Sequence, residues 1–256
     1  TEFIGRNGDL DVPAALGRVQ LSGRTGAGLD PAAALQTSFE LLPDGEREVV
    51  FILGVGQDVH EARALAQRFR GRAGARTALE GVWEHWNRLL GAVRLDAPGN
   101  PAMQALVNGW LVYQTLSCRV WGRSGFYQSG GAFGFRDQLQ DAMALLHAAP
   151  DLLRSQILLC ASRQFKEGDV QHWWHPPEGA GVRTRISDDL LWLPQAIARY
   201  VMATGDTGVL DEEAPFLTAR PLAEGEESQY EPHAHGSEIG TLYEHGVRAI
   251  RKSLAF

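Results

Sequence analysis

The sequence predicts a mixed fold in three parts: a short β region, a helical connector and a larger region that is mainly helical. Three observations support this prediction. Apolar runs bounded by turn residues occupy the chain up to Gln57, two helix-start signals follow Asp58, and apolar side chains recur at helical spacing beyond Pro101.

The β region is expected over residues 1–57. Residues 35–42 and 47–55 are predicted strands, and the sequence Pro-Asp-Gly-Glu at 43–46 favours a turn between them. The second strand contains an uninterrupted apolar run at 49–53, which indicates burial on both faces. Because a few strands cannot bury their own faces, we expect this region to be the end of a larger β-sandwich.

A helical linker is predicted over residues 58–100. Asp58 with Glu61, and Thr77 with Glu80, have the spacing of a capping box at a helix start. The linker is expected to end where Asn100 caps a new helix that has Pro101 at its first position.

The third region, residues 101–256, is predicted to be mainly helical. The expected helices are 101–122, 137–149, 152–165, 188–204 and 237–254, with Ser187 capping the fourth and Gly205 ending it. The connection 166–187 is longer than ordinary loops, and such loops are often functional.

Composition limits the class of protein. The net charge is −7 and the sequence pI is about 5.6, which argue against nucleic acid as a partner. No stretch of about 18 apolar residues occurs, so we expect no membrane contact from this segment. Cys118 and Cys160 are expected to be small buried apolar side chains, as in a protein of the reducing cytoplasm.

A Gly-rich, aromatic segment that leads into a helix is the first candidate site. Asp137 and Asp141 lie one turn apart on the same helix face, beside Arg136 and close to Gln128. The interaction of an acidic residue with the helix dipole explains Asp137 alone. The whole polar set is better suited to a polyhydroxyl ligand.

The second candidate site lies in the long connection. Trp173 and Trp174 are adjacent, so both cannot face one core, and His175 follows them. Aromatic rings bind the C–H face of a sugar, while packing of the loop onto the helices is the competing explanation. His172 and His175 have a spacing that zinc accepts, but no cysteine pair or HExxH motif accompanies them, so no metal site is predicted.

The third candidate site surrounds a helix start and contains Arg183, Arg185, Asp188 and Asp189. These four side chains either form ion pairs with one another or line a substrate site. In the second case the carboxylates bind sugar hydroxyls and a guanidinium binds an anion such as phosphate.

Three segments carry a resemblance to a known family. They are GFRDQLQD at 134–141, QFKEGDVQHWWHP at 164–176 and SDDLLWL at 187–193. The chain resembles glycoside hydrolase family 94, and within it the phosphorylase-like C-terminal region of bacterial cyclic β-1,2-glucan synthases and the 1,2-β-oligoglucan phosphorylases. The N-terminal segments 2–7 and 21–31 resemble the same subgroup.

The resemblance implies an architecture and a domain division. Residues 1–57 would be the C-terminal strands of a β-sandwich, residues 58–100 a helical linker, and residues 101–256 the N-terminal part of an (α/α)6 catalytic barrel. Five helices cannot close six helix pairs, so the chain is expected to be a fragment of a larger enzyme that contains the remaining domains.

The resemblance also implies a reaction: inverting phosphorolysis or glycosyl transfer on β-linked glucans. Asp137 matches a residue that holds hydroxyls of the non-reducing-end glucose. Gly131 replaces an arginine of cellobiose phosphorylases, which favours another linkage, in particular β-1,2. The general-acid Asp lies in a downstream Asp-Trp-Asn-Asp motif that this sequence lacks, so no catalytic residue is expected here.

The implied partners are a β-glucan oligosaccharide and inorganic phosphate as co-substrate, with no cofactor and no metal. We expect a cytoplasmic location, for a parent enzyme that can be attached to the bacterial inner membrane, and leave a homodimer open. Two alternative functions remain: a non-catalytic carbohydrate-binding region, and an inverting hydrolase that uses a carboxylate base in place of phosphate.

Overall fold

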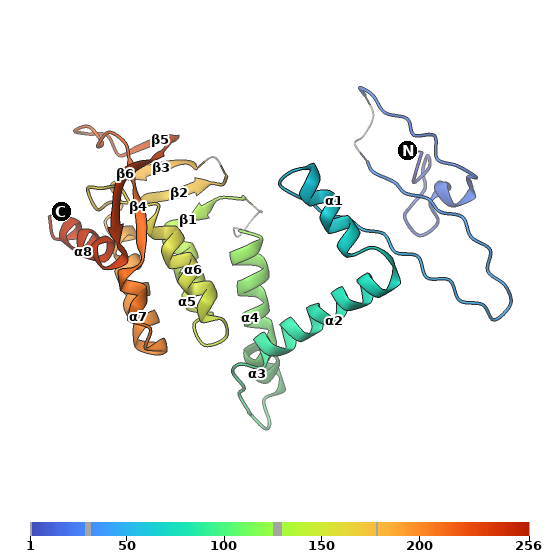
Figure 1. Cartoon of the computed structure of the whole chain (residues 1–256), viewed down its shortest axis with the longest axis horizontal. Coiled ribbons are helices and arrows are strands. Elements are labelled where there is room, and N and C mark those ends of the chain that lie inside the picture. Colours follow the sequence, from blue (N-terminus) through green and yellow to red (C-terminus); the bar gives the residue numbers. More distant parts are fainter. Residues whose placement is uncertain (1, 29–31, 125–129, 178, 256) are drawn as a thin grey trace. The chain divides into compact units, whose positions relative to one another are not determined.

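The structure is a computed structural model that describes residues 2–28, 32–124, 130–177 and 179–255. The chain divides into two compact units, residues 1–78 and 79–256, and each is described by itself (Figure 1).

The described part of the first unit has no strand, so the two strands predicted at 35–42 and 47–55 are wrong. The turn between them is confirmed: Asp44 has φ of +59°, and the Gly45 N–H donates to the Leu42 carbonyl at 2.9 Å. The flanking runs are extended but have no neighbouring strand, and Leu53 is fully exposed. An extended run becomes a strand only when a second one satisfies its backbone groups.

Helices in the first unit begin at the predicted cap. The Asp58 side chain accepts from the N–H groups of His60 and Glu61 at the start of α1 (Val59–Arg68). The next helix, α2 (Gly71–Leu90), begins at Gly71. The φ of Gly71 is +78°, which turns the chain between α1 and α2. Thr77 lies inside α2, so its predicted capping role is wrong. A short 3₁₀ helix, η1 (Ala14–Gly17), comes earlier.

One continuous helical run covers residues 101–121 in the second unit, as predicted. Asn100 caps it by accepting from the Met103 N–H at 3.1 Å. The run consists of α3 (Pro101–Ala105), η2 (Leu106–Trp110), α4 (Leu111–Gln114) and η3 (Thr115–Trp121), where η2 and η3 are π-helical.

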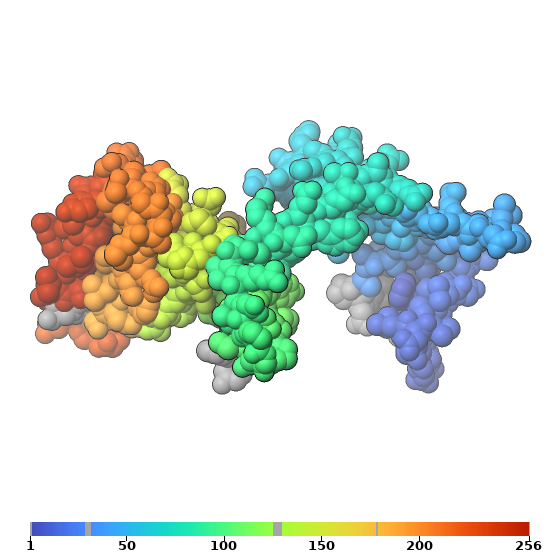
Figure 2. Space-filling model, turned by 90° about the horizontal axis from the view of Figure 1, so that it is seen from below, coloured from blue at the N-terminus to red at the C-terminus, as the bar shows by residue number. Residues whose placement is uncertain are grey.

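The run packs through Leu116, which lies against Leu145 at the end of α5. Figure 2 shows the green run beside the yellow-green α5 region. Cys118 is exposed, which corrects the expectation that it is buried, and Trp110 and Trp121 are exposed as well.

A helical layer forms the main core of this unit. Its members are α5 (Phe135–Met143), α6 (Pro150–Ala161), α7 (Trp192–Thr204) and α8 (Leu242–Ser253). As predicted, Gly205 ends α7, with φ of +73°. Ser187 caps nothing, because the 3₁₀ turn η4 (Asp189–Leu191) leads into α7. Whether these helices belong to an (α/α)6 barrel stays a prediction.

A four-stranded antiparallel sheet lies next to the helical layer (Figure 1). Its strands, in spatial order, are β1 (Phe133–Gly134), β2 (Gln171–His175), β3 (Ala180–Thr184) and β5 (Ser228–Pro232). The long connection predicted at 166–187 is therefore mainly a β2–β3 hairpin.

A second, two-stranded sheet pairs β4 (Glu213–Thr218) with β6 (Ala234–Thr241), after the 3₁₀ turn η5 (Gly208–Asp211). Residues 237–241 are strand, so the last predicted helix begins later than expected. It starts at a Thr241–Glu244 capping box.

Candidate functional site

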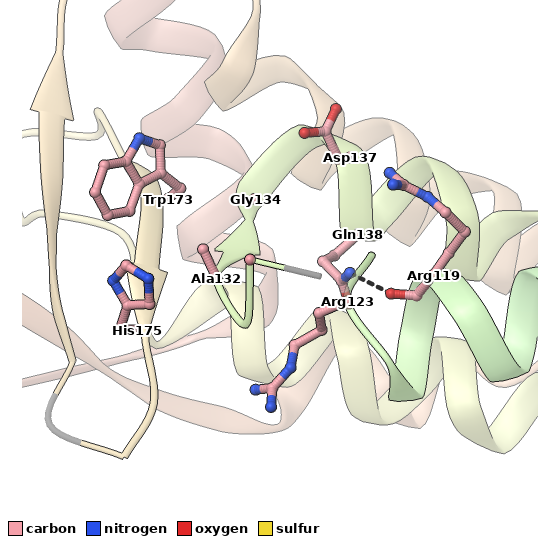
Figure 3. A pocket seen from close by; sticks show the side chains of 9 residues that line it. Arg119, Arg123, Ala132, Gly134, Asp137, Gln138, Trp173 and His175 are labelled. Atoms are coloured by element: carbon pink, nitrogen blue, oxygen red, sulfur yellow. Dashed lines mark hydrogen bonds between the residues drawn. The ribbon is translucent and has the colours of Figure 1, made fainter. Parts of the chain in front are cut away.

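A cavity of about 410 Å³ opens in the second unit, between the end of the 101–121 run, the start of α5 and strand β2 (Figure 3). The residues that line it are Arg119, Arg123, Gly130, Ala132, Gly134, Asp137, Gln138, Trp173 and His175. Figure 3 shows Trp173 and His175 on the β2 side, across from Arg119 and Gln138.

The β1–α5 junction places Asp137 at this cavity. Gly134 pairs with Trp173 across β1 and β2, and the buried Phe135 then begins α5. A Cβ on Gly134 would lie 2.7 Å from a carboxylate oxygen of Asp137, so a side chain here would displace that carboxylate. The glycine is therefore needed for the position of the acid.

The Asp137 carboxylate is accessible. Its side chain is 53% exposed, and the nearest cation, the Arg136 guanidinium, is 3.9 Å away. The N-cap position of α5 is Gly134, which makes no side-chain capping bond. The carboxylate oxygens are thus free to accept hydrogen bonds from a ligand.

Gln138 supplies a buried acceptor beside Asp137. Its Nε2 donates to the Arg119 carbonyl at 2.8 Å, as the dashed line in Figure 3 shows. Its Oε1 is buried and has no partner among the residues that the structure describes. A buried oxygen without a partner is costly, and a ligand hydroxyl would remove that cost.

Two guanidinium groups lie on the helical side of the cavity. Arg119 Nε donates to Asp141 Oδ2 at 2.9 Å, and Arg119 Nη1 donates to the Ser124 carbonyl. Arg123 lies over the Phe133 ring, with its guanidinium 4.6 Å from the ring centre.

Asp141 is bound to Arg119 and does not line the cavity. Its direct contact with a ligand stays a prediction. Burial raises the pKa of the Asp141 carboxyl, although the bond from Arg119 opposes the rise.

The two adjacent tryptophans point to opposite sides, as strand geometry requires. Trp173 lines the cavity, and the His175 ring packs edge-on against the Trp173 ring, with 5.3 Å between the ring centroids. Trp174 is only 1% exposed, and its ring stacks on the Phe133 ring with 5.5 Å between the ring centroids. The expectation that Trp174 contacts a ligand is therefore corrected, because its ring belongs to the core.

Arg183 and Arg185 hold the chain together outside the cavity. Arg183 is 2% exposed and donates to both carboxylate oxygens of Asp169, at 2.6 and 2.7 Å. Burial alone would lower the pKa of Arg183, but the bonds to Asp169 outweigh it and raise the pKa. Arg185 donates to the carbonyls of Glu226 and Ala223. Arg183 is too buried for the predicted contact with a substrate, whereas Arg185 is exposed but does not line the cavity, so its role stays a prediction.

Asp188 and Asp189 belong to a polar cluster next to Asp137. Asp188 accepts from Arg136 Nη1 at 3.1 Å, which gives Arg136 a structural partner. The buried Asp189 is hydrogen-bonded to His172 Nδ1 at 2.6 Å, and this bond raises the pKa of His172. Neither aspartate lines the cavity.

Among the predicted site residues, the structure brings Asp137, Trp173 and His175 together at one cavity, with Arg136 close by. Gln128 lies outside the described residues. In the described ranges, no group of three His, Cys, Asp or Glu side chains could hold a metal ion.

Sequence reasoning missed Arg119 and Arg123. A local signal existed for the arginines: they lie four residues apart, where the helical run ends ahead of the Gly-rich segment.

Two family models match the sequence of this chain. The catalytic domain of the glycosyl hydrolase 94 superfamily matches residues 85–256, and the supersandwich domain of glycosyl hydrolase 94 matches residues 1–72. The chain belongs to the glycosyl hydrolase 94 superfamily. The second match also confirms that the N-terminal region is part of a sandwich domain.

Individual relatives show which enzymes of this superfamily the chain is similar to. The chain is 45% identical over 252 residues to the cyclic β-(1,2)-glucan synthase NdvB of Rhizobium meliloti, covering 97% of this chain and 9% of the synthase. It is 28% identical over 257 residues to the N,N'-diacetylchitobiose phosphorylase of Vibrio proteolyticus, covering 90% of this chain and 31% of that enzyme.

A third relative is the 1,2-β-oligoglucan phosphorylase of Listeria innocua, 28% identical over 128 residues, which are 48% of this chain and 11% of that protein. The chain thus spans about a tenth to a third of the relatives named here. In the described part of the chain, no helix is both long and apolar enough to span a bilayer.

Proposed function

We propose that this chain supplies a substrate-binding wall of an enzyme that cleaves or transfers β-linked glucosyl units, by inverting phosphorolysis or glycosyl transfer. The observation that carries the proposal is the cavity at the β1–α5 junction. It combines one accessible carboxylate, one aromatic ring and two guanidinium groups.

Asp137, Gln138 and Trp173 have the chemistry that a sugar ring needs. The carboxylate of Asp137 and the unpartnered Oε1 of Gln138 accept hydrogen bonds from hydroxyl groups. The Trp173 ring offers an apolar face to the C–H side of a pyranose. A bond from a hydroxyl to a charged carboxylate contributes about 1.5–3 kcal/mol, so Asp137 is the strongest single contact.

Arg119 and Arg123 suit an anionic co-substrate. A guanidinium group presents a planar set of donors that matches phosphate oxygens. Asp141 fixes the orientation of Arg119, while Arg123 is held over Phe133. We propose that inorganic phosphate approaches on this side of the cavity.

In the proposed reaction, a phosphate oxygen bonds to the anomeric carbon as the bond from that carbon to the glycosidic oxygen breaks. The leaving oxygen takes its proton from a general acid that the family resemblance places in another segment of the parent polypeptide. The residues described here bind and orient the sugar, and binding that tightens in the transition state accelerates the reaction.

The proposed linkage is β-1,2. Its support is the relative with 45% identity, whose name specifies a β-(1,2)-glucan. Gly131, where cellobiose phosphorylases have an arginine by the family resemblance, supports a linkage other than that of cellobiose.

The test is a product analysis with the full-length parent. The enzyme is incubated with β-1,2-glucooligosaccharides and phosphate, and cellobiose and N,N'-diacetylchitobiose serve as substrate controls. We expect α-glucose 1-phosphate, the inverted product, from the β-1,2 substrates alone. Release of glucose without phosphate uptake would establish a hydrolase, and binding without any product would establish a carbohydrate-binding region.

A further inference from the structure

The four-stranded sheet has one buried face and one open face. The side chains of Trp174 and Arg183 lie on the buried face, and Gly181, which lies on β3 opposite Trp174, is buried too. Along each strand, the residues next to these three point to the open face. The residues that pair with them on a neighbouring strand point to the same open face. The open face is formed by Trp173, His175, Ala180, Val182, Thr184, Ser228, Tyr230 and Pro232.

This open face carries no carboxylate, guanidinium or ammonium group among these eight residues. Lys, Arg, Asp and Glu are the residue types most often exposed, so their absence from these eight positions distinguishes this face. The charged residues of the same strands, Arg183 and Glu231, lie on the other face. The open face therefore suits an uncharged partner.

Three residues form a row across this face. Trp173 pairs with Val182, and Val182 pairs with Tyr230. The rings of Trp173 and Tyr230 are 5.6 Å apart between centroids and are tilted by 38°. Tyr230 is 60% exposed, so much of its ring surface is open to a ligand.

The row begins in the cavity. Trp173 and His175 line the cavity (Figure 3), whereas Tyr230 does not line it and belongs to β5, two strands from β2 in the sheet. A chain of sugar rings that leaves the cavity across β2 would thus pass over β3 and reach Tyr230. A glucan is uncharged and has apolar C–H faces, so it matches both the charge and the aromatic character of the row.

We propose that Trp173, Val182 and Tyr230 form an additional sugar-binding site, which holds the third pyranose ring of a β-glucan, next to the two rings that a disaccharide places in the cavity. The inference rests on the proposed function and adds chain length to it: the enzyme would prefer oligosaccharides to disaccharides. Trp173 contacts the second and third rings, while Tyr230 contacts only the third.

The test compares substrates of two lengths with the full-length parent. The Tyr230→Ala, Tyr230→Phe and Tyr243→Ala variants are assayed on a β-1,2-linked disaccharide and on a pentasaccharide. Tyr243 is a matched control, because it is 63% exposed and lies on α8, outside the row.

We expect Tyr230→Ala to lower kcat/KM for the pentasaccharide about five- to tenfold, the size of one aromatic contact. It should leave kcat/KM for the disaccharide within about twofold, a free-energy difference below 0.5 kcal/mol. Tyr230→Phe and Tyr243→Ala should resemble wild type on both substrates.

Equal losses on both substrates, or no loss on either, would overturn the inference. A fall in melting temperature for Tyr230→Ala without a change in length preference would show that another part of the protein covers Tyr230. If wild type cleaves neither substrate, the proposed function fails. Titration calorimetry with the pentasaccharide then decides the inference: Tyr230-dependent binding supports it, and its absence overturns it.

Discussion

Asp137 has two explanations that differ at the level of one side chain. It lies in the first turn of α5, where a negative charge interacts favourably with the helix dipole. It also lines the cavity, with its carboxylate exposed and 3.9 Å from the nearest cation. The first explanation predicts a change in stability, and the second predicts a change in activity.

We expect Asp137→Asn in the full-length enzyme to lower kcat/KM by about one to two powers of ten, the effect of losing a charge-assisted hydrogen bond. The melting temperature should change little, because the dipole interaction of an exposed acid contributes only about 0.3–1 kcal/mol. Asp151→Asn, an acid in the first turn of α6, is the control and should leave kcat/KM unchanged. An unchanged kcat/KM for Asp137→Asn would leave Asp137 a structural residue.

The His172–Asp189 pair allows a prediction of pH dependence. The bond to Asp189 raises the pKa of His172 above the ordinary value of 6.5. Because the pKa of His172 is raised in the folded state, the bond to Asp189 stabilises the fold fully at pH values below 6.5. This stabilisation is lost as the pH rises through the raised pKa.

The melting-temperature difference between wild type and His172→Asn should therefore be larger at about pH 5.5 than at about pH 8.5. Scanning calorimetry at the two pH values measures it. His147→Asn, at an exposed position on the same unit, should show no such dependence. An equal difference at both pH values would contradict the pairing.

At the scale of elements, a glycine at the β1–α5 junction and a glycine in β3 are expected to differ in whether their substitution affects activity or stability. A Cβ at Gly134 would meet the end of the Asp137 side chain, which can move aside, whereas a Cβ at Gly181 would lie 2.2 Å from the Trp173 carbonyl oxygen, which cannot. The two glycines therefore differ in what an added methyl group would disturb.

We expect Gly134→Ala to lower kcat/KM by about tenfold or more, because the Asp137 carboxylate is displaced, while the melting temperature stays near that of wild type. Gly181→Ala should instead lower the melting temperature by several degrees, as backbone overpacking costs about 1–3 kcal/mol. Parallel kinetics and thermal scans on the two variants test this contrast. A large drop in melting temperature for Gly134→Ala would contradict it.

Elements with local signals were predictable from the sequence. Asn100 and Pro101 start the helical run, Asp58 starts α1 and Gly205 ends α7, because caps depend on neighbouring residues. The four-stranded sheet depends on pairings between distant segments, such as β3 with β5, and no local pattern marks them.

The candidate site shows the same limit. Asp137 stood out because its neighbours in the sequence are polar, and Trp173 because it is next to Trp174. The pairing of Gly134 with Trp173, which brings the two segments together, could not be read from either segment. Likewise, Asp141 and Arg183 looked like ligand contacts, but their partners Arg119 and Asp169 lie elsewhere in the chain.

At the scale of the whole molecule, the first unit exposes much apolar surface. Leu53 is fully exposed and Val55 is 90% exposed, and both lie in the extended run 47–55, for which the sequence predicts a buried strand. The match of residues 1–72 to a supersandwich domain explains the contradiction, because further strands of such a domain would cover these side chains.

We therefore expect the 256-residue chain, expressed by itself, to self-associate through residues 47–55, because exposed apolar runs in extended conformation pair with one another. Light scattering after size-exclusion chromatography should show a concentration-dependent mass above that of a monomer. Replacing Phe51 and Leu53 by lysine should return the mass to that of a monomer, because charges on an edge oppose pairing. Lysine at the exposed Leu79 and Val82 of α2 is the control and should leave the association unchanged. A monomeric wild-type chain at all concentrations would contradict the proposed role of the exposed, extended run 47–55.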